Sequence, residues 1–177
     1  TIWEKMFPHN RLVRKSGFIE LASTSIDGDS YTAGRMSDGE KLVFYLIGAV
    51  LCAPDNALLI IEEPEVLLHD SIKNPLWDEV EAMRPDCTYV YLTHDIDFAY
   101  RWADRIHVMA RGQCTAAFDA ADFPANAHAL AAADLPVPGI IDLHRQLVAS
   151  GHLPAGQSPR SIGELTELIK HQGMGAQ

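Results

Sequence analysis

The strongest constraint on the fold is a short apolar run that ends abruptly in acidic residues. Residues 57–61 read ALLII, and Glu62 and Glu63 follow directly. Such a run is typical of a strand buried in a parallel sheet, and Pro64 fixes the turn after the acids because it lacks an N–H donor. The sequence therefore predicts a buried parallel strand that delivers two carboxylates to the carboxyl edge of a sheet.

The carboxyl edge of an open α/β sheet is where ligands of such folds bind. Two neighbouring acids at this edge suit magnesium-nucleotide chemistry, because one can support the metal's ligand shell while the other polarises a water. The alternative is a strand that simply ends in two solvated acids. Pro64 favours the functional interpretation, since it holds the turn immediately after Glu62 and Glu63.

Helix and strand signals alternate on both sides of this run. A capping box formed by Ser37 and Glu40 predicts a helix that starts at Ser37. Helices are predicted over residues 37–53, 71–84 and 96–103, strands over 17–23, 57–61 and 88–92, a turn at 27–29, and a hairpin from 106–109 and 115–118. Residues 1–14 are compatible with a short helix and a loop. The alternation predicts an α/β fold, a parallel sheet with flanking helices.

The composition changes after about Asp119. An alanine-rich stretch and several prolines follow, and helices are predicted over residues 140–150 and 161–171, the second opened by a capping box of Ser161 and Glu164. We therefore expect one domain over residues 1–119 and a small helical appendage over residues 120–177.

Composition narrows the class of protein. With 47% hydrophobic residues the chain can bury a core, and its net charge of -10 argues against a broad nucleic-acid or anionic-membrane surface. No apolar run reaches the roughly 18–20 residues that a membrane span needs. Cys52, Cys87 and Cys114 are odd in number, widely spaced and set among apolar neighbours, which predicts buried, reduced thiols in a cytoplasmic protein.

Two further segments suit phosphate chemistry. A serine hydroxyl and backbone N–H groups at the start of the helix at Ser37 form a phosphate site, and Gly39 permits close approach to the backbone. His94 follows the predicted strand 88–92, where a neutral imidazole can hydrogen-bond a γ-phosphate or an attacking water. The alternatives are an ordinary capped helix and a structural or exposed histidine.

The order of these segments resembles the ATPases of ABC-type proteins. Residues 36–40 (MSDGE) match the signature motif, residues 58–63 (LLIIEE) the Walker B strand, residues 65–70 the D-loop and His94 the H-loop. The resemblance implies an ATPase that uses ATP and Mg²⁺. Within it, the signature residues Ser37, Gly39 and Glu40 would contact ATP held by a second ATPase subunit. It also implies that Glu62 supports magnesium, that Glu63 is the catalytic base and that His94 senses the γ-phosphate.

Two segments of the sequence resemble two different branches of this superfamily. The central part of the sequence resembles soluble AAA ATPases, which are related to the overcoming-lysogenisation-defect nucleases and to SMC/Rad50-like repair ATPases. The resemblance lies in residues 31–41, in EEPE at residues 62–65 and in Leu68-His69. The tail, residues 105–165, is similar to the C-terminal dimerisation element of energy-coupling-factor transporter ATPases. The main expectation is a soluble repair or phage-defence ATPase. The alternative is an ATP-binding subunit of a transporter, and the matching partners are nucleic acid or a membrane transporter subunit.

The chain departs from the family pattern in its phosphate-binding residues. No lysine follows a glycine, so the Gly-Lys-Ser/Thr loop is absent from this sequence. Glu62 stands where the family usually has Asp, and Asp38 where transporters often have Gly. We therefore expect hydrolysis only when a missing N-terminal half or a partner completes the site, and poor ATP binding by the chain alone. A non-catalytic interaction module, with Glu62 and Glu63 as relics, is the third interpretation.

Overall fold

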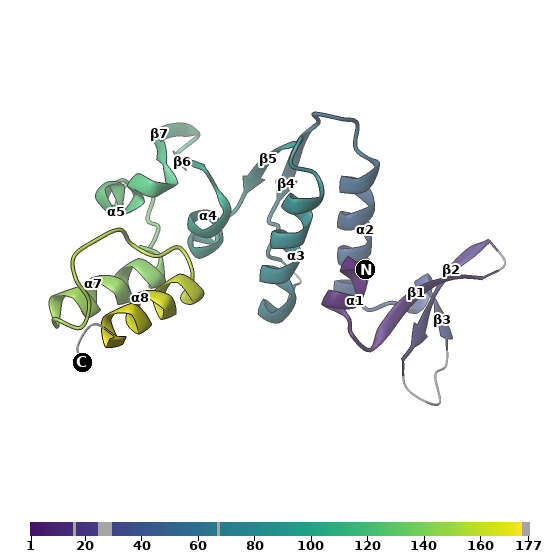
Figure 1. Ribbon diagram of the computed structural model, residues 1–177. Helices are drawn as coiled ribbons and strands as arrows, with labels where there is room; N and C mark the ends of the chain where they lie inside the picture. Colours follow the sequence, from purple (N-terminus) through teal and green to yellow (C-terminus); the bar gives the residue numbers. More distant parts are fainter. Residues whose placement is uncertain (16, 25–29, 67, 175–177) are drawn as a thin grey trace. The chain divides into compact units, whose positions relative to one another are not determined.

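The chain forms two compact units, Thr1–Leu92 and Thr93–Gln177. The structure is a computed structural model that describes residues 1–15, 17–24, 30–66 and 68–174 (Figure 1). Within those ranges no helix is both long enough and apolar enough to span a membrane. The division falls inside residues 1–119, which the sequence assigns to the ATPase domain, and that assignment stays a prediction.

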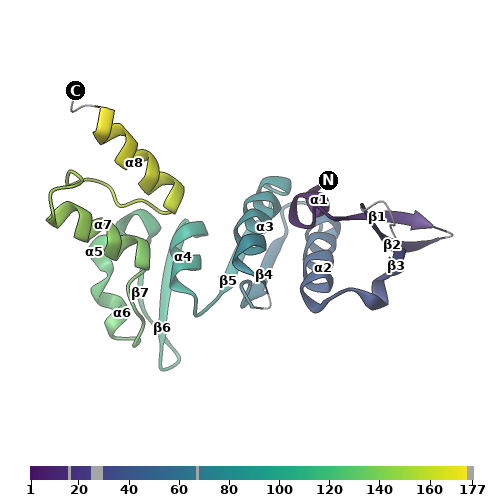
Figure 2. The same ribbon diagram turned by 90° about the horizontal axis from the view of Figure 1, so that it is seen from below.

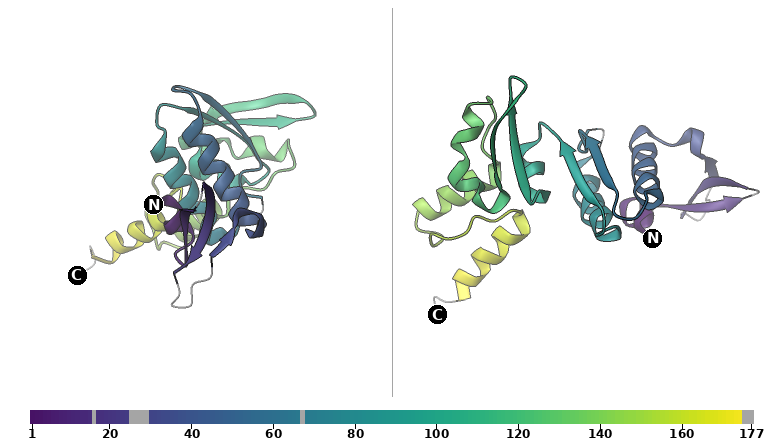
Figure 3. Two further views of the ribbon diagram at one scale, coloured as in Figure 1. Left: turned by 90° about the vertical axis from the view of Figure 1, so that its right-hand side faces the viewer. Right: turned by 90° about the horizontal axis from the view of Figure 1, so that it is seen from above.

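The first unit begins with a short helix and an antiparallel sheet. Helix α1 (Ile2–Met6) leads into β1 (Asn10–Lys15), β2 (Phe18–Ser23) and β3 (Ser30–Thr32), which pair in the order β1-β2-β3 (Figure 3). The strand predicted over residues 17–23 is confirmed as β2, and the short helix as α1. Strands β1 and β3 were not predicted, and the turn predicted at residues 27–29 lies outside the described residues.

A helix–strand–helix–strand run completes the first unit. The 3-10 turn η1 (Ala33–Arg35) precedes α2 (Asp38–Cys52), β4 (Leu58–Glu62), α3 (Asp70–Met83) and β5 (Thr88–Leu92). Strands β4 and β5 are parallel, with Leu58 opposite Thr88 and Glu62 opposite Leu92. The helices, the strands and their parallel pairing are as the sequence predicts. The chain has the mixed α/β class, with a parallel sheet and flanking helices.

Helix α3 covers one face of the parallel pair (Figures 1 and 2). Leu76, Trp77 and Val80 of this helix are fully buried. The Trp77 ring meets Tyr91 of β5 edge to face, with ring centroids 5.3 Å apart. This contact joins α3 to the strand that lies beside Glu62.

The opposite face of the pair corrects the prediction of a buried strand. Four aliphatic side chains on alternate positions remain largely exposed: Leu58 (61%), Ile60 (64%), Val90 (41%) and Leu92 (51%). Residues that pair in register share a face of a sheet, so these four form one surface, which we call the bare face. The prediction was wrong for this face because apolar alternation shows which residues favour burial, but not whether the same chain covers them.

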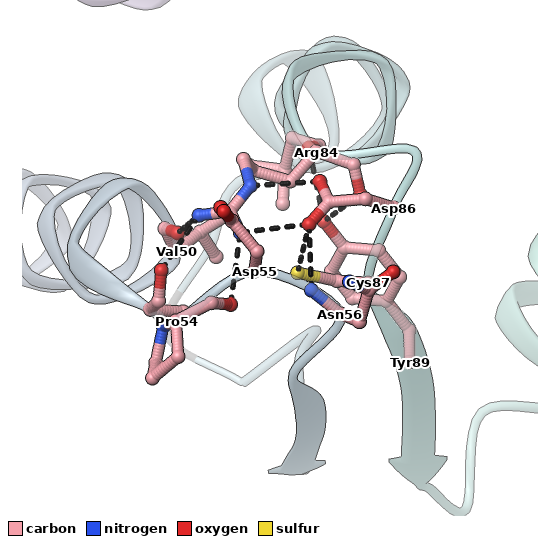
Figure 4. A network of polar contacts seen from close by, with 10 residues as sticks. Val50, Pro54, Asp55, Asn56, Arg84, Asp86, Cys87 and Tyr89 are labelled. Atoms are coloured by element: carbon pink, nitrogen blue, oxygen red, sulfur yellow. Dashed lines mark hydrogen bonds and ion pairs between the residues drawn. The ribbon is translucent and has the colours of Figure 1, made fainter.

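An arginine fixes the amino ends of both parallel strands (Figure 4). Arg84 donates from Nη1 to the carbonyls of Val50 and Ala53, at 3.1 and 2.9 Å, and so caps the carboxyl end of α2. Its Nε and Nη2 each lie 2.9 Å from Asp86, whose carboxylate also accepts from the Asn56 backbone N–H at 2.9 Å. The pKa of Asp86 lies well below its ordinary value because of these bonds, with Arg84 as the main cause.

The second unit combines a hairpin with short helices. It contains α4 (Ile96–Trp102), β6 (Arg105–Ala110), β7 (Gln113–Asp119), η2 (Ala120–Asp122), α5 (Phe123–Asn126), α6 (His128–Ala131), α7 (Gly139–Ala149) and α8 (Ile162–Met174). Strands β6 and β7 form the predicted antiparallel hairpin. Its core brings Tyr100, Val108, Phe123 and Ile141 together. Arg160 caps α4 by donating to the carbonyls of Tyr100 and Ala103.

The cysteine prediction is partly wrong. None of the three thiols forms a disulfide bond, but Cys52 and Cys114 are exposed and Cys87 is half-buried. Cys52 is the last residue of α2 and Cys114 lies in a hairpin strand, where apolar neighbours in sequence do not become neighbours in a core. Their burial therefore could not be inferred from flanking residues.

Candidate functional site

The acids Glu62 and Glu63 lie at the carboxyl end of β4, where the sequence predicts them. Glu62 is the last residue of the strand and pairs with Leu92, the last residue of β5. Both carboxylates are exposed. The strand ends thus present two acids to solvent at the carboxyl edge of the parallel pair, which is the edge where α/β folds place their ligands.

Glu63 has an unusual backbone conformation. Its φ is +47°, in the left-handed region that residues other than Gly, Asn and Asp rarely adopt. Its N–H donates to Leu92 O at 2.7 Å, and its carbonyl accepts from the Val66 N–H at 3.0 Å. Such a conformation costs about 1–3 kcal/mol and persists only where surrounding contacts impose it. The strand therefore breaks at Glu63, and this residue does not continue the alternation of β4.

The donor set suits magnesium in part. Carboxylate oxygens are the ligands that Mg²⁺ prefers, and in nucleotide sites one or two carboxylates usually act together with phosphate oxygens and water. Among the described residues no group of three or more His, Cys, Asp or Glu side chains could hold an ion by itself. The carboxylate of Glu62 has the chemistry for one such ligand, and its role at a magnesium ion stays a prediction.

The start of α2 forms the predicted capping box. The Ser37 hydroxyl accepts from the Glu40 N–H at 3.2 Å, and the Glu40 carboxylate accepts from the Ser37 N–H at 2.8 Å. The amides of Asp38 and Gly39 belong to the same first turn, whose N–H groups have no partner within the helix. The helix dipole adds a favourable field for an anion at this end.

Glu40 also joins α2 to the antiparallel sheet. Its carboxylate accepts hydrogen bonds from Tyr31 Oη at 2.8 Å, from Asn10 Nδ2 at 3.1 Å and from Ser37 Oγ at 2.9 Å. Burial pushes the pKa of Glu40 upward, but the bonds from Ser37, Tyr31 and Asn10 outweigh it, and the pKa lies below its ordinary value. Burial and the Glu40 carboxylate raise the pKa of Tyr31. Glu40 is thus held as a buried carboxylate with four donors, and its part in nucleotide binding stays a prediction.

His94 is exposed and belongs to the second unit. Along the chain it lies two residues after Leu92 and directly before Asp95, the N-cap of α4. Asp95 accepts from the Phe98 N–H at 2.9 Å and donates its own N–H to Thr93 Oγ1 at 2.8 Å. These bonds fix the start of α4 directly after His94.

The predicted residues fall into separate groups. Glu62 and Glu63 share one strand end, and Ser37, Gly39 and Glu40 share one helix start, but no hydrogen bond or ion pair in the described part of the chain joins the two groups. Asn10 and Tyr31 were missed because they reach Glu40 from 30 and 9 residues away, and no local pattern marks such partners.

Comparisons with known proteins point to one class. The chain is 28% identical over 143 residues to the energy-coupling factor transporter ATP-binding protein EcfA2 of Methanospirillum hungatei, covering 80% of this chain and 35% of that protein. It is 29% identical over 167 residues to EcfA1 of Listeria innocua (92% and 57%). It is 32% identical over 146 residues to a putative ABC transporter ATP-binding protein of Thermosynechococcus vestitus (78% and 49%).

No family model matches the chain. The chain spans between about a third and somewhat over half of the length of these relatives. Their names give no support to the soluble repair or defence branch, and they favour the transporter alternative. The similarity to ABC transporter ATP-binding proteins supports an ABC-type ATPase domain in this chain.

Proposed function

We propose that the chain is the part of an ABC transporter ATP-binding protein that carries the hydrolytic acids, and that it binds and hydrolyses ATP together with a phosphate-binding loop from outside this sequence. The observation that carries the proposal is the pair Glu62 and Glu63 at the carboxyl end of a strand parallel to β5. The transporter relatives favour a peripheral subunit that pairs with a second ATPase subunit and with a membrane partner.

Each predicted residue has a role in this proposal. When bound, Mg²⁺–ATP supplies the phosphoryl group and a cation that neutralises its charge. Glu62 would support the cation's ligand shell, and Glu63 would accept the proton of the attacking water. The role of His94 as a hydrogen-bond donor to the γ-phosphate rests on the sequence resemblance alone.

The signature residues act on a nucleotide that the second subunit holds. Ser37 and Gly39 contact it through the first turn of α2, and the turn keeps its shape because Glu40 closes the capping box. This arrangement needs no contact between the helix start and the acids of the same copy.

The bare face supports the need for a further segment. Parallel sheets occur almost only with both faces covered, so the exposed aliphatic side chains of this pair mark a surface on which a further segment can pack. Leu58, Ile60 and Val90 provide an apolar surface for such a segment. The relatives contain the additional length for a strand and a Gly-Lys-Ser/Thr loop.

Magnesium-dependent ATP hydrolysis by the native polypeptide that contains this chain tests the proposal. Glu63→Gln keeps the side chain's shape, removes the base, and is expected to lower kcat at least 100-fold. Asp104→Asn removes one exposed acid elsewhere and should leave turnover within about twofold. Unchanged turnover in Glu63→Gln and His94→Ala would instead favour the non-catalytic interaction module.

A second variant addresses the bare face. Ile60→Lys adds a charge to a side chain that is exposed in this chain, so the isolated chain should remain folded. In the native polypeptide the same variant should abolish ATPase activity, because a buried unpaired ammonium opposes packing of the completing segment. Normal activity of Ile60→Lys would contradict the assignment of the bare face.

A further inference from the structure

The turn after Glu63 is held by a side chain from another element. Trp77 lies in α3, is fully buried, and donates from Nε1 to the carbonyl oxygen of Pro64 at 3.3 Å. This bond is itself buried, and Pro64 is a buried residue. A buried carbonyl needs a donor, and the Trp77 indole supplies one.

Two backbone bonds also hold this turn. Glu63 N–H donates to Leu92 O, and Val66 N–H donates to Glu63 O. Pro64 has no N–H to contribute. Trp77 therefore provides a link between the turn and helix α3, directly after the residue with a left-handed backbone.

The ring of Trp77 is fixed independently of the turn. It packs edge to face on Tyr91, whose hydroxyl donates to Glu81 at 2.8 Å, and Leu76 and Val80 of the same helix are fully buried beside it. A donor on an immobilised ring holds its acceptor within a narrow range of positions. The position of the Pro64 carbonyl, and with it the backbone of Glu63, follows from the packing of α3 on β5.

We propose that Trp77 is a positioning residue for Glu63, because its indole N–H fixes the turn that places the Glu63 carboxylate at the carboxyl end of β4. The proposal rests on the proposed function for the role of Glu63 as a base. It adds that the placement of the base depends on a specific hydrogen bond from α3.

The rival interpretation is that Trp77 is only a large core residue. Trp77→Phe separates the two, because it keeps an aromatic ring against Tyr91 and removes the donor to Pro64. Val80→Ala is the matched control, since it also removes buried volume from α3 and leaves the bond to Pro64 intact. Tyr91→Phe removes the hydrogen bond to Glu81, which lies about one helical turn after Trp77 in α3.

Amide hydrogen exchange of the full 177-residue chain, resolved by residue, gives a readout that needs no activity. We expect Trp77→Phe to raise the exchange rates of the Glu63 and Val66 amides about threefold to tenfold, the range of one net hydrogen bond. The Thr88 amide, which bonds to Ala57 O at the other end of the strand pair, should change less than about twofold.

The controls decide between the interpretations. Val80→Ala should change the exchange rates of the Glu63, Val66 and Thr88 amides to a similar extent. Tyr91→Phe should leave the exchange rates of the Glu63 and Val66 amides unchanged. The proposal is overturned if Trp77→Phe leaves the Glu63 and Val66 amides unchanged, if it affects Thr88 equally, or if Val80→Ala reproduces its selective pattern.

ATP turnover by the native polypeptide supplies the second readout. Trp77→Phe should lower kcat about tenfold with KM within about twofold, and it should add nothing in the Glu63→Gln background, since it acts through that residue. Normal turnover in Glu63→Gln would defeat the proposed function while the exchange data still decide the link to the turn. A loss in Glu63→Gln together with an additive effect of Trp77→Phe would overturn the positioning role alone.

Discussion

The hydrogen bonds of Glu40 with Ser37, Tyr31 and Asn10, which we call the Glu40 network, allow a quantitative test of how α2 is joined to the antiparallel sheet. Its carboxylate accepts four hydrogen bonds, from Tyr31, from Asn10 and twice from Ser37. In Glu40→Gln a single carbonyl oxygen remains, so it can serve either the Ser37 pair or the Tyr31 and Asn10 pair. At about 1 kcal/mol for each lost bond, Glu40→Gln should lower the free energy of unfolding by about 2 kcal/mol and Glu40→Ala by about 4 kcal/mol.

Urea unfolding followed by tryptophan fluorescence measures this loss. In a Trp102→Phe background the remaining tryptophans, Trp3 and Trp77, both lie in the first unit. The control is Asp38→Asn, a change in the same helical turn at a side chain that is 84% exposed and only weakly paired. It should change the free energy of unfolding by less than about 0.5 kcal/mol.

A double-mutant cycle sharpens the test. Tyr31→Phe should cost about 1 kcal/mol in the parent chain and much less in the Glu40→Gln background. Because the folded-state pKa of Glu40 is lowered from its ordinary value of 4.5, its contribution is fully present above that value and is lost as pH falls through the lower pKa. Stabilities that do not change in Tyr31→Phe and Glu40→Gln, or an acid response as large in Glu40→Gln as in the parent chain, would refute the network.

Three further predictions follow from other contacts. Arg160→Met should lower the free energy of unfolding by about 2 kcal/mol in thermal or urea melts, because the last carbonyls of α4 lose their donor. Gly48→Ala should raise stability by about 1 kcal/mol in the same melts, since an added Cβ meets no atom within 4 Å and alanine favours a helix interior. Asp86→Asn should flatten the acid limb of the stability profile: the pKa of Asp86 is lowered, so its contribution is present above about pH 4 and is lost as pH falls further.

Local signals predicted the helix starts and the strand pair well. The Ser37 and Glu40 capping box placed the start of α2, and the strand expected over residues 88–92 has the same bounds as β5. The sequence could predict these bounds because capping boxes and apolar runs act within a few residues. Parallel pairing followed from the alternation of strands and helices, since a crossover helix is the usual route between parallel strands.

Features that depend on residues far apart in the sequence could not be predicted. Strand β1 reads NRLVRK, and its charged residues carry no alternating apolar signal, so only its pairing with β2 makes it a strand. The left-handed backbone of Glu63 has no signal either, because glutamate seldom adopts it and the contacts that impose it come from Leu92 and Trp77. The exposure of the bare face depends on what covers the sheet, which the residues of β4 do not specify.

The contact between Arg84 and Asp86 has a consequence for the alignment of the two parallel strands. No tight turn connects β4 to β5, so nothing in the connection itself prevents one strand from slipping along the other. Asp86 accepts the Asn56 N–H just before β4, while Cys87 next to it leads into β5, so the two strands are aligned before their first paired residues. A slip of one residue would turn Glu62 toward the face that α3 covers. The face of the sheet on which Glu62 lies is therefore tied to the contacts of Asp86 at the other end of the strands.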